Sequence, residues 1–141
     1  VLTRADAVAE LYQLAGAPAV SGSVTFTDVA ADVSYAKAVA WAQSTGIVTG
    51  INASTFAPDQ TVTREQFALI LYRFAKAQGK NTQAANSSLN AYSDRAQVSA
   101  WAAPGVKFAM GSKALSGASI SPRTTVSTTD ADAALTVLNR L

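Results

Sequence analysis

Apolar side chains recur at helical spacing in five stretches of the chain. One stretch predicts a helix from Tyr35 to Ser44, and another predicts a helix from Thr63 to about Lys76. The residues after Thr3, around Val106 and after Val126 show the same spacing. The positions that carry these predictions are Val8, Leu11, Tyr12, Leu14; Ala38, Val39, Trp41, Ala42; Phe67, Ile70, Leu71, Phe74; Val106, Phe108, Ala109, Met110; and Ala134, Leu135, Val137, Leu138, Leu141.

Polar and turn-forming residues separate these helices. Residues 50–60 predict a turn-rich loop, and Gly46, Gly50 and Gly117 are expected to adopt positive φ. Residues 15–23 and 77–90 predict polar surface linkers. Asp28 and Asp94 each follow an aromatic residue by two positions, and we expect each carboxylate to cap a turn, as Asx turns do.

Two segments of the chain repeat one another, and a third is present in part. The first holds, in order, Phe26-Thr27-Asp28, Ala38-Val39-Ala40-Trp41-Ala42, Gly46-Ile47-Val48-Thr49-Gly50, Phe56-Ala57-Pro58 and Val62-Thr63-Arg64-Glu65. The second holds Tyr92-Ser93-Asp94, Gly105-Val106-Lys107-Phe108-Ala109, Lys113-Ala114-Leu115-Ser116-Gly117, Ile120-Ser121-Pro122 and Val126-Ser127-Thr128-Thr129. Thr3-Arg4-Ala5-Asp6 matches the start of the second helix. One helix-loop-helix unit cannot bury its apolar face alone, so we expect an all-α body of stacked units.

The start of the second helix carries a capping signature. Thr63 with Gln66, and Thr3 with Asp6, have the spacing of a capping box. Arg4 and Arg64 are less expected, because a cation in the first turn opposes the helix dipole. Beside free helix N–H groups, each guanidinium can bind a carboxylate or phosphate. The alternatives are pairing with a nearby carboxylate, from Glu65, Asp59 or Asp6, and simple exposure to solvent.

Composition excludes several classes of function. The 141 residues contain no cysteine and no histidine, so a disulfide scaffold, a Ser-His-Asp triad and common transition-metal sites are excluded. The net charge is +2 and the cations are scattered, which does not favour nucleic-acid binding. The apolar stretches are too short to span a membrane. No signal peptide opens the chain, and we expect a mature or trimmed piece of a secreted bacterial surface protein.

The ordered motifs resemble the S-layer homology (SLH) module. Residues 26–76 match one whole module, residues 91–141 resemble a degenerate module, and residues 1–16 resemble the C-terminal half of a preceding one. The resemblance implies a pseudo-threefold spindle around a three-helix bundle. It also implies non-covalent anchoring to a Gram-positive-type cell wall. The implied partner is an anionic secondary cell-wall polysaccharide, often pyruvylated, bound in grooves between modules without a cofactor.

The family's Thr-Arg-Ala-Glu signature carries over to Thr3-Arg4-Ala5-Asp6 and Thr63-Arg64-Glu65-Gln66, where Asp6 and Gln66 replace the final Glu. The resemblance implies that each Arg meets the charge of the sugar. The third copy lacks this Arg, and Thr129 or Asp130 is expected to cap the last helix. Candidate glycan-binding residues are Arg64, Arg4, Thr63, Glu65, Trp101, Tyr35 and Gly50.

Each of these residues also has a structural alternative. Trp101 and Tyr35 can stack on a sugar or pack on the surface, and Trp41 is expected to pack in the core. Gly50 can admit a sugar to the backbone or only serve the turn. Arg64 is the leading glycan contact, since the groove of Arg4 belongs to a module without its first helix. Upstream chain or a second copy can supply that helix.

Three functions follow as hypotheses. The first is a non-catalytic carbohydrate-binding anchor outside the cell, on the bacterial wall. The second is a structural or protein–protein module that keeps the scaffold without binding glycan. The third is a hydrolase that uses carboxylates alone, for which no distinctive acid pair is present.

Overall fold

The protein is all-α, as the helical spacing predicted. The computed structural model describes residues 2–20, 25–48, 50–52 and 54–141, so Thr49 and the end of the predicted linker over 15–23 lie outside the described residues. Within the described chain, helices are joined by loops, and extended pairing is limited to two isolated bridges. The elements are α1 (Arg4–Leu14), α2 (Ala36–Ser44), α3 (Arg64–Ala77), η1 (Gln83–Asn86), η2 (Arg95–Gln97), η3 (Ala100–Ala102), α4 (Ala103–Gly111) and α5 (Thr128–Asn139).

Helices α1, α3 and α5 begin at equivalent capping residues. The Thr3 hydroxyl accepts the Asp6 N–H at 3.1 Å, and the Asp6 carboxylate accepts the Thr3 N–H at 3.1 Å. Thr63 and Gln66 form the same capping box in α3. In α5 the cap is Ser127, whose hydroxyl accepts the Asp130 N–H at 3.1 Å. The prediction that Thr129 or Asp130 caps this helix was wrong, because both residues already lie within its first turn.

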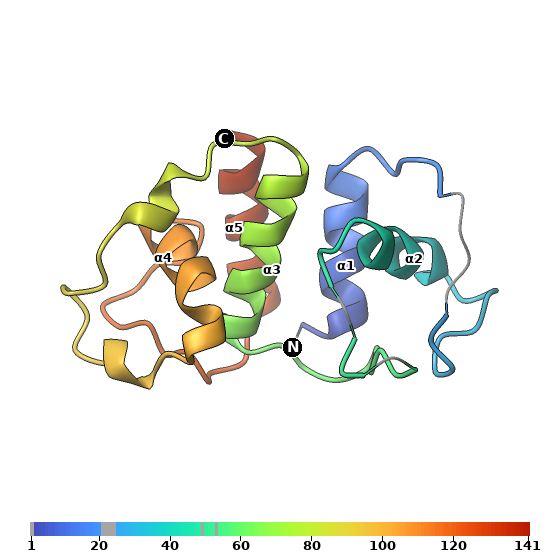
Figure 1. Cartoon of the computed structure of the whole chain (residues 1–141), viewed down its shortest axis with the longest axis horizontal. Helices are drawn as coiled ribbons and strands as arrows, with labels where there is room; N and C mark the ends of the chain where they lie inside the picture. Colours follow the sequence, from blue (N-terminus) through green and yellow to red (C-terminus); the bar gives the residue numbers. More distant parts are fainter. Residues whose placement is uncertain (1, 21–24, 49, 53) are drawn as a thin grey trace.

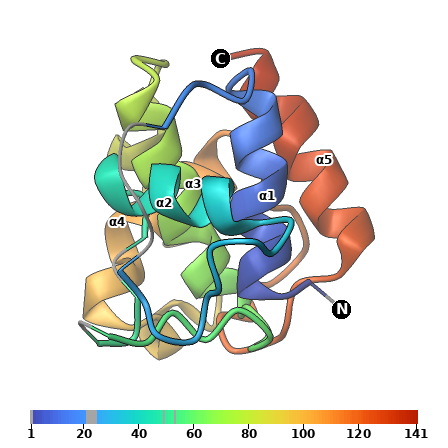
Figure 2. The ribbon, with the colours of Figure 1, turned by 90° about the vertical axis from the view of Figure 1, so that its right-hand side faces the viewer.

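A closed ring of backbone hydrogen bonds ties the three helix starts together. The Leu2 N–H donates to Val126 O at 3.2 Å, the Val126 N–H to Val62 O at 2.9 Å, and the Val62 N–H to Leu2 O at 3.2 Å. Each residue comes directly before a capping residue, and all three are fully buried. The three helices rise in the same direction from this end (Figures 1 and 2). The ring supports a pseudo-threefold arrangement, which stays a prediction for the whole molecule.

The first helix of each repeat packs on the second helix of the preceding one. Helix α2 packs against α1, and α4 packs against α3, so α2 and α4 flank the three long helices (Figure 1). Trp41 is buried in this core, with its ring 5.5 Å from that of Tyr12 and 6.2 Å from that of Phe74. Stacking between repeats therefore buries the apolar faces, and the core role expected for Trp41 is confirmed.

The predicted surface linker over 77–90 is more ordered than its polarity suggested. It forms η1, which packs against α4, and the Ser87 hydroxyl donates to Lys107 O at 3.0 Å. Leu89 is buried in the core cluster. The segment lies largely on the surface, as predicted, but η1 and Leu89 attach part of it to the body of the protein.

The loop glycines have the conformation that the sequence predicted. Gly46, Gly50 and Gly117 all have positive φ. At Gly50, with φ of 80°, an added Cβ would also lie 2.5 Å from the Phe26 ring. The position therefore requires glycine for packing as well as for backbone conformation.

Candidate functional site

The signature arginines fasten one repeat to the next. Arg4 donates its Nε–H to Phe56 O at 2.8 Å, and Arg64 donates its Nε–H to Ile120 O at 2.8 Å. Phe56 and Ile120 are equivalent loop positions. Neither arginine takes Glu65, Asp59 or Asp6 as its partner among the described residues. Each guanidinium therefore holds a loop carbonyl of the following repeat in place.

Asp28 and Asp94 hold the same loops from their N–H side. Asp28 accepts the N–H groups of Phe56 and Ala57 at 2.9 and 2.8 Å. Asp94 accepts those of Ile120 and Ser121 at 3.0 and 2.8 Å. These hydrogen bonds lower the pKa of both carboxyl groups, and the nearby arginines lower it further. Each carboxylate therefore caps a turn, as predicted, but the turn lies in a loop distant in sequence and not beside the Asp itself.

Arg64 is enclosed by its own chain. Its side chain is buried, and a second N–H donates from Nη2 to Ser116 O at 3.1 Å. Nη1 of Arg64 lies 3.7 Å from Oδ2 of Asp130, and these two residues form the only ion pair within the described part of the chain. The hollow lined by Ser116 and Asp130 has a volume of about 70 Å³. The hydrogen-bonding capacity and charge of Arg64 are therefore largely taken up internally.

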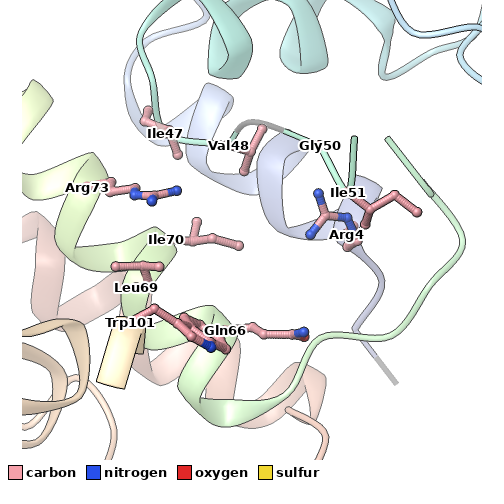
Figure 3. Close-up of a pocket in the computed structure, with 10 residues that line it drawn as sticks. All are labelled: Arg4, Ile47, Val48, Gly50, Ile51, Gln66, Leu69, Ile70, Arg73 and Trp101. Atoms are coloured by element: carbon pink, nitrogen blue, oxygen red, sulfur yellow. The ribbon is translucent and has the colours of Figure 1, made fainter. Parts of the chain in front are cut away.

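Arg4 borders a much larger cavity of about 560 Å³. The cavity lies between the start of α1, the loop after α2, helix α3 and the turn before α4 (Figure 3). All three repeats therefore contribute to it. Its lining residues are Arg4, Ile47, Val48, Gly50, Ile51, Gln66, Leu69, Ile70, Arg73 and Trp101.

Two cations face this cavity from different elements. Arg4 approaches from α1, and Arg73 lies across from it on α3 (Figure 3). Burial lowers the pKa of Arg4, and the negative charge of Asp28 partly offsets that effect. Arg73 forms no side-chain hydrogen bond or ion pair with another described residue. No carboxylate is among the lining residues, so the cavity favours an anion.

The rim of the cavity is apolar. The side chains of Ile51 and Trp101 are 57% and 54% exposed, and both belong to the lining. An exposed indole beside cations suits a ligand with an apolar face and a charged group. A pyranose ring that carries an acid group has both features.

The structure brings together three of the seven candidate residues, Arg4, Gly50 and Trp101. The other four lie elsewhere. Thr63 caps α3, Glu65 is buried against Ser99, and Arg64 is fastened as described above. Tyr35 is partly buried, packs against the core and does not line the cavity.

Arg73 was missed by the sequence analysis. Gln66, Leu69, Ile70 and Arg73 follow one another at i, i+3, i+4 and i+7, which places them on one face of α3. This face adjoins the buried one. Its spacing could have identified Arg73, but only the fold shows that it turns toward Arg4.

The equivalent positions on the other two long helices are charged differently. Asp130 and Val137 replace Gln66 and Arg73 on α5, and Glu10 replaces Ile70 on α1. One oxygen of Glu10 is buried with no partner among the described residues. Burial raises the pKa of Glu10, and the charges of Asp132 and Asp6 raise it further. The other two long helices therefore do not repeat the pairing of Gln66 with Arg73 on α3.

Glu10→Gln is expected to stabilise the protein at neutral pH. Because the pKa of Glu10 is raised in the folded protein, the protonated carboxyl group favours the folded state. This contribution to stability is complete below the ordinary pKa of 4.5 and is lost as the pH rises through the pKa of the folded protein. Thermal unfolding should show a higher Tm for the variant at about pH 7 and little difference at about pH 3.5. Asp59→Asn, at an exposed carboxylate, is the control. A variant less stable than the natural chain at neutral pH would contradict the assignment.

Comparison with known proteins identifies the repeat. The sequence model of the S-layer homology domain matches residues 25–68. The chain is also 30% identical, over 103 residues, to the surface-layer 125 kDa protein of Lysinibacillus sphaericus. The alignment covers 73% of this chain and 8% of that relative. No helix in the described part of the chain is long and apolar enough to cross a membrane.

Proposed function

Because this chain belongs to the S-layer homology domain family, we propose that it anchors a larger protein by binding an anionic cell-wall polysaccharide in the Arg4 cavity. The family assignment indicates a module of the bacterial cell surface. The finer elements of the proposal are the glycan, its acid group and the cavity that binds it. A ketal-pyruvate group is the proposed source of the negative charge.

The observation that carries this proposal is the pair of arginines without a facing carboxylate. Arg4 and Arg73 line one cavity, and no acidic side chain lines it with them. A guanidinium binds a carboxylate through two parallel hydrogen bonds, and such charge-assisted bonds are stronger than neutral ones. An acid group in this cavity would be attracted by both cations.

The exposed indole supports a sugar as the carrier of that charge. Trp101 is 54% exposed and lies at the cavity on the side of α3 (Figure 3). The C–H face of a pyranose packs on such a ring. Arg4 and Arg73 supply charge, and Trp101 supplies a flat apolar surface. We place Arg64, Thr63, Glu65 and Tyr35 outside the direct contact surface.

The proposed role is binding without hydrolysis. A glycosidase needs two carboxyl groups on either side of the scissile bond. The cavity is lined by none, so a bound glycan has no acid or base beside it. The structural or protein–protein module remains the competing hypothesis. The observation in its favour is that Arg64 pairs with Asp130 within the chain, as a structural residue would.

A pull-down on purified cell-wall sacculi tests the proposal. The natural chain should bind sacculi that carry the secondary polysaccharide and should not bind sacculi stripped of it. Trp101→Ala should weaken binding about tenfold because the stacking surface is lost, whereas Trp101→Phe should retain most of it. Equal binding to both kinds of sacculi, or release of soluble saccharide, would overturn the proposal.

A further inference from the structure

Glu65 is a buried carboxylate without a cationic partner in the described structure. It is 4% exposed and forms no ion pair there. Its Oε2 accepts the Ser99 N–H at 3.0 Å, and its Oε1 accepts the Ser99 hydroxyl at 2.7 Å. Both oxygens of a buried charge are thus committed to a single residue, which lies in the next repeat.

The local environment explains why a charge is tolerated there. Burying a carboxylate is costly unless hydrogen bonds and nearby positive potential compensate for it. Glu65 lies in the first turn of α3, where the helix dipole favours negative charge. Its two hydrogen bonds to Ser99 are charge-assisted and therefore strong. The contact is a firm attachment between α3 and the chain at Ser99.

Ser99 leads directly into the turn that bears the exposed indole. It is the residue before η3, and Trp101 is the middle residue of that short turn. Since Trp101 is more than half exposed, packing contacts alone hold its ring weakly. The attachment at Ser99 fixes the backbone two residues before Trp101. We propose that Glu65 is a positioning residue, which holds the indole of Trp101 over the Arg4 cavity through Ser99.

The repeats of this chain provide an internal comparison. The position of Glu65 is occupied by Ala5 in α1 and by Thr129 in α5, and neither carries a carboxylate. Val33 and Tyr35 occupy the positions of Ser99 and Trp101 in the preceding repeat. Both are partly buried and pack against the core. The carboxylate attachment therefore occurs where the aromatic ring is exposed, as expected if its purpose is to hold that ring.

The order of Trp101 can be measured without any ligand. In a Trp41→Phe background, Trp101 is the single tryptophan, so fluorescence anisotropy and acrylamide quenching report on its indole. Glu65→Gln replaces one acceptor oxygen by an N–H₂ group. We expect lower anisotropy and stronger quenching, with unchanged helical circular dichroism. Ser99→Ala removes only the hydroxyl group and should change anisotropy and quenching in the same direction but by less. This variant still tests the proposal if Glu65→Gln does not fold.

Gln97→Ala is the matched control, because this exposed residue lies in the neighbouring turn η2 and makes no side-chain hydrogen bond among the described residues. Unchanged anisotropy and quenching in both Glu65→Gln and Ser99→Ala would overturn the positioning role.

The consequence for binding rests on the proposed function. Purified wall polysaccharide should bind Glu65→Gln about five- to tenfold more weakly than the Trp41→Phe parent, since a mobile indole must be ordered on binding. Changed fluorescence together with unchanged affinity would uphold the attachment and overturn the Arg4 cavity as the glycan site. The two failures are therefore distinguishable.

Discussion

Arg73→Glu is expected to abolish retention on polysaccharide-bearing cell wall, and Arg73→Ala to lower the affinity about tenfold or more. A hydrogen bond to a charged group contributes about 1.5–3 kcal/mol, which corresponds to roughly 10- to 150-fold in affinity. Arg73 has no other partner in the described structure, so its removal should leave the fold intact. Charge reversal adds repulsion between the ligand and the new carboxylate. Titration of purified wall polysaccharide by calorimetry measures both effects.

The other arginines provide matched controls. Arg123→Ala removes an exposed cation and should not change the affinity. Arg64→Ala should lower the Tm, because Arg64 supports the loop at Ser116 and Ile120, and should change the affinity much less than Arg73→Ala. Full binding by Arg73→Glu would contradict the Arg4 cavity as the site. Loss of binding in Arg64→Ala at a temperature where it stays folded would restore the original sequence-based assignment.

Gly105→Val is expected to cause the largest loss of stability. An added Cβ at Gly105 would lie 2.6 Å from Leu69 Cα and 2.7 Å from Leu69 N, which are backbone atoms of α3. Backbone atoms within a helix cannot move aside, so α4 must separate from α3. Overpacking of a core typically costs 1–3 kcal/mol, and we expect about 3 kcal/mol or more here. That is a large part of the 5–15 kcal/mol typical of a domain.

Urea unfolding followed by circular dichroism measures this loss. Gly79→Ala is the matched control, since Gly79 has φ of 68° and open space around its Cα. It should cost about 1 kcal/mol, from backbone conformation alone. Because Gly105 packs on Leu69, which lines the cavity, surviving Gly105→Ala protein should also bind polysaccharide more weakly. A Gly105→Val variant as stable as the natural chain would contradict the close packing of α3 and α4.

Local features of this fold were predictable because they depend on residues within one or two turns. The capping boxes at Thr3 and Thr63 follow from side chains three residues apart. The positive φ of Gly46, Gly50 and Gly117 follows from turn chemistry. The exception is the cap of α5, where Ser127 was overlooked although it stands in register with Thr3 and Thr63.

Contacts between segments that are distant in sequence were harder to predict. Asp28 and Asp94 resemble ordinary turn residues in sequence, yet their partners lie in other loops. The segment over 77–90 is polar and lies largely on the surface, as predicted, but its turn η1 packs on α4. In both cases local chemistry was compatible with the prediction, and packing at long range selected a different partner.

At the candidate site, the sequence determined which residue types are present, and the tertiary structure determined which of them lie together. The sequence alone identifies the signature arginines, Trp101 as a candidate and the resemblance to the family, because these are properties of residue type and order. The repeat pattern places Arg4 and Arg64 at equivalent positions, and it favoured Arg64 because the module of Arg4 lacks its first helix. Their difference arises where helices from different repeats meet. Asp130 lies beside Arg64, whereas Arg73 and Trp101 line the cavity of Arg4 with no carboxylate among them. Charge compensation acts through space, so tertiary packing determines which arginine remains available.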